Sequence, residues 1–277
     1  MSKTTAVRDP HRFVNELGDE AVERLITRLE SRAKDSVFTG LIDKYSSHLT
    51  HFNPTMVLEV GCGTGAMIRS FVRREDFTGN AIGLDQSIPF IDAAKSFARH
   101  EHLEKRLQFQ LGDAHNLDFP AASFDTVIAN TLISHVSDPV RVLEEMARVV
   151  RPGGTIAIFD GDYASLTYAF PDHDFGQQMD KALATASFNN PRIMRDLPRM
   201  LDTLSLQLVD AWGDAVVEIG NGSYFKSFAE TYAPYVMDSG MMADDKVDTW
   251  LSVQRKSMES GTFFASCTYY TYLLRRV

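Results

Sequence analysis

The sequence has few of the features that mark a secreted or membrane-embedded chain. Only two of its 277 residues are cysteines, Cys62 and Cys267, which gives neither a disulfide framework nor a pair of metal ligands. No run approaches the roughly 20 apolar residues that a membrane-spanning helix needs. The polar start, residues 1–12, has no signal-peptide core. The sequence therefore indicates a cytoplasmic protein with no membrane partner.

An excess of positive charge is absent as well. The chain has 28 Lys and Arg against 37 Asp and Glu, a formal net charge of -9. That balance disfavours a protein whose main partner is the phosphate backbone of a nucleic acid, and no basic run, internal repeat or low-complexity linker is visible. The length and a hydrophobic content of 44% are those of one large globular domain or a core with an elaborated cap.

What the sequence does contain is a regular alternation of apolar strands and amphipathic helices. After helices expected at 20–34 and 38–48, we expect seven strands, at 56–60, 80–85, 107–111, 124–130, 155–160, 206–219 and 261–274. The fifth is almost wholly apolar, and strands of that kind that alternate with helices are buried on both faces and parallel. The prediction is an α/β fold, a doubly wound, mostly parallel, seven-stranded, Rossmann-like sheet.

The segments outside this alternation are expected to surround a ligand. We divide the single domain into an N-terminal helical lid or arm, a cofactor-binding core, a helical cap inserted after the fifth strand, and the rest of the sheet with further cap helices. Their expected bounds are 1–55, 56–160, 161–205 and 206–277. Residues 1–18 are expected to be a loose arm, and no strand is expected at 162–204.

The first strand runs directly into a glycine-rich turn. Residues 57–66 read V-L-E-V-G-C-G-T-G-A, with glycines at 61, 63 and 65. Glycine adopts positive φ freely and lets main-chain N–H groups reach a ligand. Asp85 follows Gly65 by twenty positions at the end of the second strand, where a carboxylate can accept hydrogen bonds from ribose hydroxyls. The pattern indicates a cofactor that contains a nucleoside.

Two classes of cofactor fit the turn. Residues 61–66 satisfy the dinucleotide pattern G-x-G-x-x-G/A, so an NAD(P)-linked oxidoreductase stays open. The extra Gly65, the acidic Glu59 just before the turn and Asp113 at the end of the third strand favour another reading. A pyrophosphate prefers helix N-terminal amides without a neighbouring carboxylate, whereas Glu59 suits a cofactor that carries an ammonium group.

Five motifs in order across residues 56–160 resemble the class I S-adenosylmethionine-dependent methyltransferases, in particular the small-molecule branch that includes ubiquinone and menaquinone biosynthesis. They are Val57–Gly65, Gly83–Asp85, Gly112–Ala114, Phe124–Asn130 and Arg151–Gly154. The resemblance implies that Asp85 holds the ribose, and that Asp113 and the Ala114 amide meet the adenine. The implied cofactor-binding set is Glu59, Gly61, Gly63, Gly65, Asp85, Gln86, Asp113, Ala114 and Asn130.

Methyl transfer from a sulfonium needs alignment and exclusion of water more than covalent help. A base is needed only for a hydroxyl or an acidic carbon. His135, after the fourth strand, is the candidate, because it lies on the ligand edge of the sheet and histidine titrates near neutral pH. Asp160, Asp162 and Tyr163 are weaker candidates. No metal site is expected, since the spacing of His48 and His51 is weak without a further ligand.

The cap is rich in Phe, Tyr and Met, which suits a pocket for a small, largely apolar metabolite, with the acceptor atom N, O or C left open. The expected reaction is methyl transfer from S-adenosyl-L-methionine, releasing S-adenosyl-L-homocysteine, in secondary or other small-molecule metabolism. The alternatives are the NAD(P)-linked oxidoreductase and a non-methylating member of the family that binds the cofactor and catalyses a cyclisation. A homodimer is left open.

Overall fold

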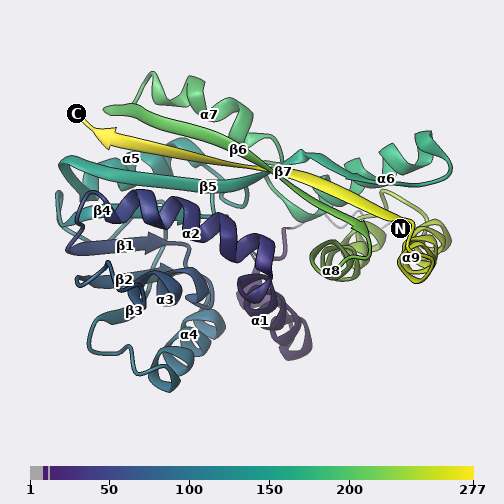
Figure 1. Cartoon of the computed structure of the whole chain (residues 1–277), viewed down its shortest axis with the longest axis horizontal. Helices are drawn as coiled ribbons and strands as arrows, with labels where there is room; N and C mark the ends of the chain where they lie inside the picture. The colour runs from purple at the N-terminus through teal and green to yellow at the C-terminus, as the bar shows by residue number, and fades with distance from the viewer. Residues whose placement is uncertain (1–8, 12) are drawn as a thin grey trace.

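A computed structural model describes residues 9–11 and 13–277, and in it a seven-stranded sheet forms the centre of the molecule (Figure 1). The strands are β1 Met56–Val60, β2 Asn80–Asp85, β3 Leu107–Leu111, β4 Phe124–Asn130, β5 Val150–Tyr168, β6 Leu206–Gly220 and β7 Phe263–Arg276. Their order is β3-β2-β1-β4-β5-β7-β6. β7 pairs antiparallel with both neighbours and the other pairings are parallel, as the mostly parallel prediction requires.

Helices cover both faces of the sheet. They are α1 Asp19–Lys34, α2 Ser36–Thr50, α3 Ala66–Val72, α4 Ile88–His100, α5 Pro139–Val149, α6 His173–Ser187, α7 Ile193–Leu201, α8 Tyr224–Asp238 and α9 Asp244–Glu259. Buried side chains of α2, α3 and α4 form one hydrophobic cluster with the sheet, and those of α5 and α7 form another on the opposite face. None of the helices in the described part of the chain is long and apolar enough to cross a bilayer.

The three strands at one side of the sheet are much longer than the rest. β5, β6 and β7 have 19, 15 and 14 residues, whereas β1 has five. Their far ends extend past the carboxyl edge of the short strands and carry α6, α8 and α9 (Figure 1). These cap helices therefore stand beside the edge where parallel strands of this topology bind ligands, at the switch point between β1 and β4.

Two expectations from the sequence were wrong. The fifth strand continues to Tyr168, because residues 162–168 pair antiparallel with β7, across a register shift between Asp162 and Thr167. The arm is not loose where it is described: Val14–Glu16 forms a 3-10 helix, η1, and Asp9 is only 6% exposed. Residues 1–8 and 12 of the expected arm lie outside the described residues.

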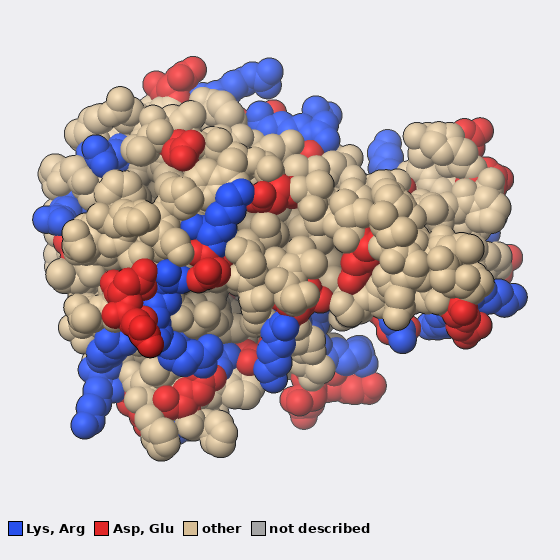
Figure 2. All heavy atoms as spheres, in the orientation of Figure 1, with Lys and Arg blue, Asp and Glu red and all other residues tan. Residues whose placement is uncertain are grey.

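Charged side chains of both signs are interspersed on the face shown in Figure 2. Among the described residues, Arg69 and Arg73 pair with Glu101, and Arg74 pairs with Asp76. Several basic side chains are therefore paired with acidic neighbours.

Candidate active site

The turn after β1 has the positive φ angles that its glycines were expected to allow. Gly61, Gly63 and Gly65 have φ of +69°, +53° and +73°, in the left-handed region that side chains disfavour. Space is short as well: a Cβ on Gly61 would lie 2.4 Å from Leu132 Cδ1, and one on Gly65 would lie 2.4 Å from Phe109 Cζ. The turn leads directly into α3, and residues 61–64 and 66–67 line one cavity, whereas the predicted Gly65 is not among its lining residues.

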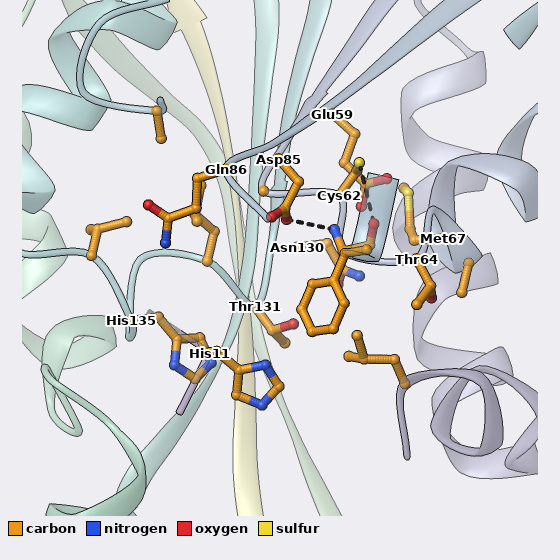
Figure 3. A pocket seen from close by; sticks show the side chains of 18 of the residues that line it. His11, Glu59, Cys62, Thr64, Met67, Asp85, Gln86, Asn130, Thr131 and His135 are labelled. Carbon is orange, nitrogen blue, oxygen red and sulfur yellow. Dashed lines mark hydrogen bonds between the residues drawn. The ribbon is translucent and has the colours of Figure 1, made fainter. Parts of the chain in front are cut away.

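Asp85 braces this turn from the end of β2. Its Oδ2 accepts a hydrogen bond from Gly63 N–H at 2.8 Å, drawn in Figure 3, and its Oδ1 accepts one from Ser87 N–H at 2.9 Å. Burial raises the pKa of Asp85, and the two backbone hydrogen bonds oppose that rise. Each carboxylate oxygen has a second lone pair, so the side chain can still accept hydrogen bonds from a ligand.

Two further polar groups reach the cavity from beneath the turn. Glu59 is 1% exposed, and its Oε2 accepts a hydrogen bond from Ile68 N–H at 3.2 Å. Burial raises the pKa of Glu59 well above its ordinary value. Asn130, at the end of β4, has a buried Oδ1 that accepts no hydrogen bond from any of the described residues. An orphaned buried acceptor in a cavity is the kind of group that a ligand donor satisfies.

The other sequence-predicted residues lie around the same cavity. Asp113 and Ala114 follow β3 and Gln86 follows β2, and all three line the cavity; Asp113 and Gln86 are exposed at its outer side. Asp113 Oδ1 accepts a hydrogen bond from His115 N–H at 2.9 Å. The hydrogen bonds and charge of His115 outweigh the effect of burial and lower the pKa of Asp113, which keeps it an ionised acceptor.

His135 lines the cavity from the loop after β4 and is held by a residue that the sequence did not point to. Its Nδ1 lies 2.6 Å from Asp9 Oδ2. Because a carboxylate only accepts, Nδ1 carries the proton and Nε2 is left as the acceptor in the neutral ring. Burial alone would lower the pKa of His135, but the charge of Asp9 and the hydrogen bond to it raise that pKa above the ordinary 6.5.

His11 lies beside His135 and extends the same network. The two rings are 4.7 Å apart between centroids, and Figure 3 shows them side by side in the cavity. His11 Nε2 shares a hydrogen bond of 2.8 Å with the Tyr232 hydroxyl. Burial, together with the positive charges of His135, Arg32 and Arg28, lowers the pKa of His11 well below 6.5. Near neutral pH, His11 is therefore uncharged.

The half of the cavity that faces the cap is aromatic. It is lined by rings from β5, the α6–α7 loop and α8, namely Tyr163, Phe188, Tyr224, Phe228 and Tyr232. Tyr163 and Phe188 stack nearly parallel, with an interplanar angle of 8°. The cavity therefore has two unlike halves, a polar one at the glycine turn and an aromatic one under the cap.

Helix α1 closes the cavity opposite the sheet. Glu30 accepts a hydrogen bond from Thr64 Oγ1 at 2.6 Å and pairs with Arg69 of α3 at 2.6 Å, which ties the helix to the glycine turn. Arg28 and Arg32, on the same helix, line the cavity. Sequence reasoning missed both arginines, although a signal exists: they share the helix face of the apolar Leu25 and Leu29.

The weaker candidates after the fifth strand have separate positions. Asp160 accepts hydrogen bonds from Ser134 N–H at 3.0 Å and from Gly161 N–H at 2.8 Å, so it shapes the loop that carries His135. Asp162 pairs with Arg195 of α7 at 2.6 Å and does not line the cavity. Among residues 9–11 and 13–277, no group of three His, Cys, Asp or Glu could hold a metal ion.

The sequence and the fold are similar to those of known methyltransferases. Residues 58–158 match the family described as "Methyltransferase domain". An uncharacterized 37.1 kDa protein in a transposon of Streptomyces fradiae is 28% identical over 190 residues, 68% of this chain and 52% of that protein. Demethylmenaquinone methyltransferase of Lactobacillus johnsonii is 34% identical over 103 residues, 37% of this chain and 42% of that enzyme. The chain spans about half or less of the length of these relatives.

Solved structures show the same fold at lower identity. Geranyl diphosphate C-methyltransferase from Streptomyces coelicolor, in complex with Mg²⁺, geranyl diphosphate and S-adenosyl-L-homocysteine, superposes with a TM-score of 0.51 at 15% identity, covering 85% of this chain and 78% of that one. The sheet order, the glycine turn and the matched segment agree with one another. Residues 58–158 carry the sequence pattern of a methyltransferase domain, and they form the core of a Rossmann-like seven-stranded sheet.

Proposed function

We propose that the protein transfers a methyl group from S-adenosyl-L-methionine to a small, largely apolar metabolite by in-line displacement. The observation that carries this proposal is a single cavity with two unlike halves. Carboxylates, amides and the glycine turn line one half, and aromatic rings under the cap line the other. A cofactor and an apolar acceptor bound in the two halves would lie next to each other, as a displacement requires.

The residues of the first half suit the cofactor of the family. Asp85 offers acceptors for ribose hydroxyls, Asn130 an unsatisfied carbonyl oxygen, and Glu59 a buried carboxylate for an ammonium group. The glycines allow the left-handed turn that places Gly61 and Gly63 in the cavity wall. The cofactor supplies a methyl group already activated on a sulfonium. A pyrophosphate fits less well, because Glu59 would lie near its negative charge, so the NAD(P) alternative is disfavoured.

His135 is proposed as the general base for an acceptor whose methylated atom is a hydroxyl oxygen or an acidic carbon. Its neutral Nε2 can take the acceptor proton, while Asp9 holds Nδ1–H and stabilises the imidazolium that results. The cap and α1 exclude water from the reacting atoms. Asp9 is a positioning residue in this scheme, because it acts through His135.

Calorimetric titration with S-adenosylmethionine, S-adenosylhomocysteine and NAD(P)H tests the cofactor assignment. We expect micromolar binding of the first two, weakened roughly tenfold or more in Asp85→Ala, which removes hydrogen bonds to a charged group. Asp92→Ala, at an exposed position of α4 outside the cavity, is the matched control and should bind as the wild type does. Binding of NAD(P)H alone would refute the proposal. Cofactor binding without methyl transfer to any acceptor would favour the non-methylating alternative.

A further inference from the structure

Arg28 is a buried cation on the acceptor side of the cavity. It is 6% exposed, and its Nη1 donates to Ser227 Oγ at 2.9 Å. Its guanidinium lies over three rings of the cap, 5.1 Å from the centroid of Tyr224, 5.2 Å from Phe228 and 5.3 Å from Tyr232. No carboxylate of the described residues pairs with it, and residues 1–8 and 12 contain no Asp or Glu.

The other arginine of the described residues that is buried to this degree does have carboxylate partners. Arg69, equally buried on α3, is paired with Glu30 and Glu101. Arg32, one turn along α1 from Arg28, donates to Thr131 Oγ1 at 2.9 Å and likewise has no ion pair within the described part of the chain. Asp9 is engaged by the His135 ring and by the backbone N–H of His11. The fold therefore neutralises a buried arginine elsewhere and leaves the cavity arginines without a counter-ion.

The energetics argue that Arg28 is not present for stability. Burying a charge costs free energy even after relaxation, and cation–π contacts return only part of it. An apolar side chain among the same three rings would avoid that cost. Burial opposes the charge of Arg28, but the neighbouring tyrosines outweigh that effect and raise its pKa. A buried cation without a counter-ion can form charge-assisted hydrogen bonds with an anionic group of a ligand.

Arg28 and three of the carboxylates that line the cavity lie in different halves of it. The carboxylates Glu59, Asp85 and Asp113 lie on the glycine-turn side. Arg28 lies among the cap rings, with the uncharged His11 nearby. Resting on the proposed function, we propose that the methyl acceptor is an apolar or aromatic acid whose carboxylate, or another oxyacid group, is bound by Arg28. The rings of the cap would then hold its apolar body beside His135.

Two sources could supply the anion, the acceptor or the carboxylate of the cofactor itself, and one experiment separates them. S-Adenosylhomocysteine is first titrated into wild type, Arg28→Gln and Arg24→Gln. Arg24, one turn earlier on α1, is exposed and paired with Glu20, so its variant is the matched control. We expect the same affinity for S-adenosylhomocysteine in all three proteins. A drop of tenfold or more in Arg28→Gln alone would assign the anion to the cofactor and overturn the proposal.

The proteins saturated with S-adenosylhomocysteine are then titrated with 4-hydroxycinnamate and benzoate, and with their methyl esters as neutral probes. We expect the acids to bind wild type and Arg24→Gln at least about tenfold more tightly than the esters, and Arg28→Gln to lose that preference. Acids that bind no better than esters, or not at all, would overturn the inference. Failure of S-adenosylhomocysteine to bind wild type would instead refute the proposed function.

Thermal unfolding of ligand-free Arg28→Met gives a readout that needs no probe. Replacing an uncompensated buried charge with an apolar side chain should leave the melting temperature unchanged or raise it. A fall of several degrees would show that the arginine stabilises the cap, and would overturn the inference independently of any ligand. Arg28→Lys keeps a positive charge and is expected to retain part of the preference for acids.

Discussion

At the scale of single residues, the site depends on a chain of contacts that begins in the arm. Asp9 receives hydrogen bonds from the His135 ring and from the backbone of His11, and His11 in turn contacts Tyr232 of α8. The pKa values of these two adjacent imidazoles are therefore shifted in opposite directions. Asp9 raises the pKa of His135, whereas burial and neighbouring cations lower that of His11. Only one of them is suited to cycle a proton near neutral pH.

Asp9→Asn should lower the pKa of His135, because burial and the charge of Arg32 remain while the opposing carboxylate is lost. In the wild type the pair stabilises the fold fully below pH 6.5, and this contribution is lost as the pH rises through the raised pKa of His135. NMR titration of the imidazole signals measures the shift without an acceptor. Asp92→Asn should leave the His135 signals unchanged. An unaltered titration in Asp9→Asn would contradict the positioning role.

Glu59→Gln should have opposite effects on stability and on cofactor affinity. Because burial raises the pKa of Glu59 far above 4.5, stability is lost as the pH rises from 4.5 through that raised value. The amide of the Glu59→Gln variant does not titrate, so this loss of stability does not occur, and its oxygen still accepts the hydrogen bond from Ile68 N–H. We therefore expect higher stability at pH 8 in urea unfolding, and affinity for S-adenosylhomocysteine weakened roughly tenfold. Unchanged affinity would show that Glu59 does not contact the cofactor.

At the scale of elements, the cap is held by the part of β5 that extends past the short strands. Tyr168 N–H, at the end of β5, donates to Asp180 Oδ1 of α6 at 3.1 Å. Burial raises the pKa of Asp180 from 3.8 to about 7. The contact between α6 and the sheet therefore depends on a carboxyl group that releases its proton near neutral pH.

Asp180→Asn should stabilise the protein, and more so at high pH. The pKa of Asp180 is raised on folding, so the wild type loses stability as the pH rises from 3.8 to about 7, and the amide does not. We expect the gain in free energy of unfolding to be on the order of 2 kcal/mol larger at pH 8 than at pH 5. Urea unfolding at both pH values measures it. Asp174→Asn, at an exposed position of α6, serves as the control, and equal gains at both pH values would contradict the prediction.

Features that local sequence patterns determine could be predicted from the sequence, and features that depend on distant packing could not. The glycine turn and Asp85 were placed correctly, because each lies within a few residues of the strand that positions it. The extension of β5 was missed, because its partner strand lies about a hundred residues later and residues 162–168 contain no local turn signal. Asp9 and Arg28 were missed because they reach the cavity through the packing of the arm and α1, which local periodicity does not describe.

At the scale of the whole molecule, cofactor binding should add to the stability of the fold. S-Adenosylhomocysteine at about 100 times its dissociation constant should stabilise the fold by about 2.7 kcal/mol. For a chain of this size that raises the melting temperature by roughly 5–10 °C. Differential scanning fluorimetry measures the shift, which Asp85→Ala should reduce and NADH should not produce. An equal shift with NADH would contradict the cofactor assignment.

The place of β7 between β5 and β6 has a consequence for how the chain is made. Within the described sheet β6 pairs with β7 alone, so from the synthesis of residue 220 until that of residues 263–276 it has no neighbour, and β5 keeps one open edge. Unpaired strand edges of this kind invite association with other chains. Until the ribosome delivers β7, both edges of β6 and one edge of β5 are unpaired, and that interval is when chaperones would matter most.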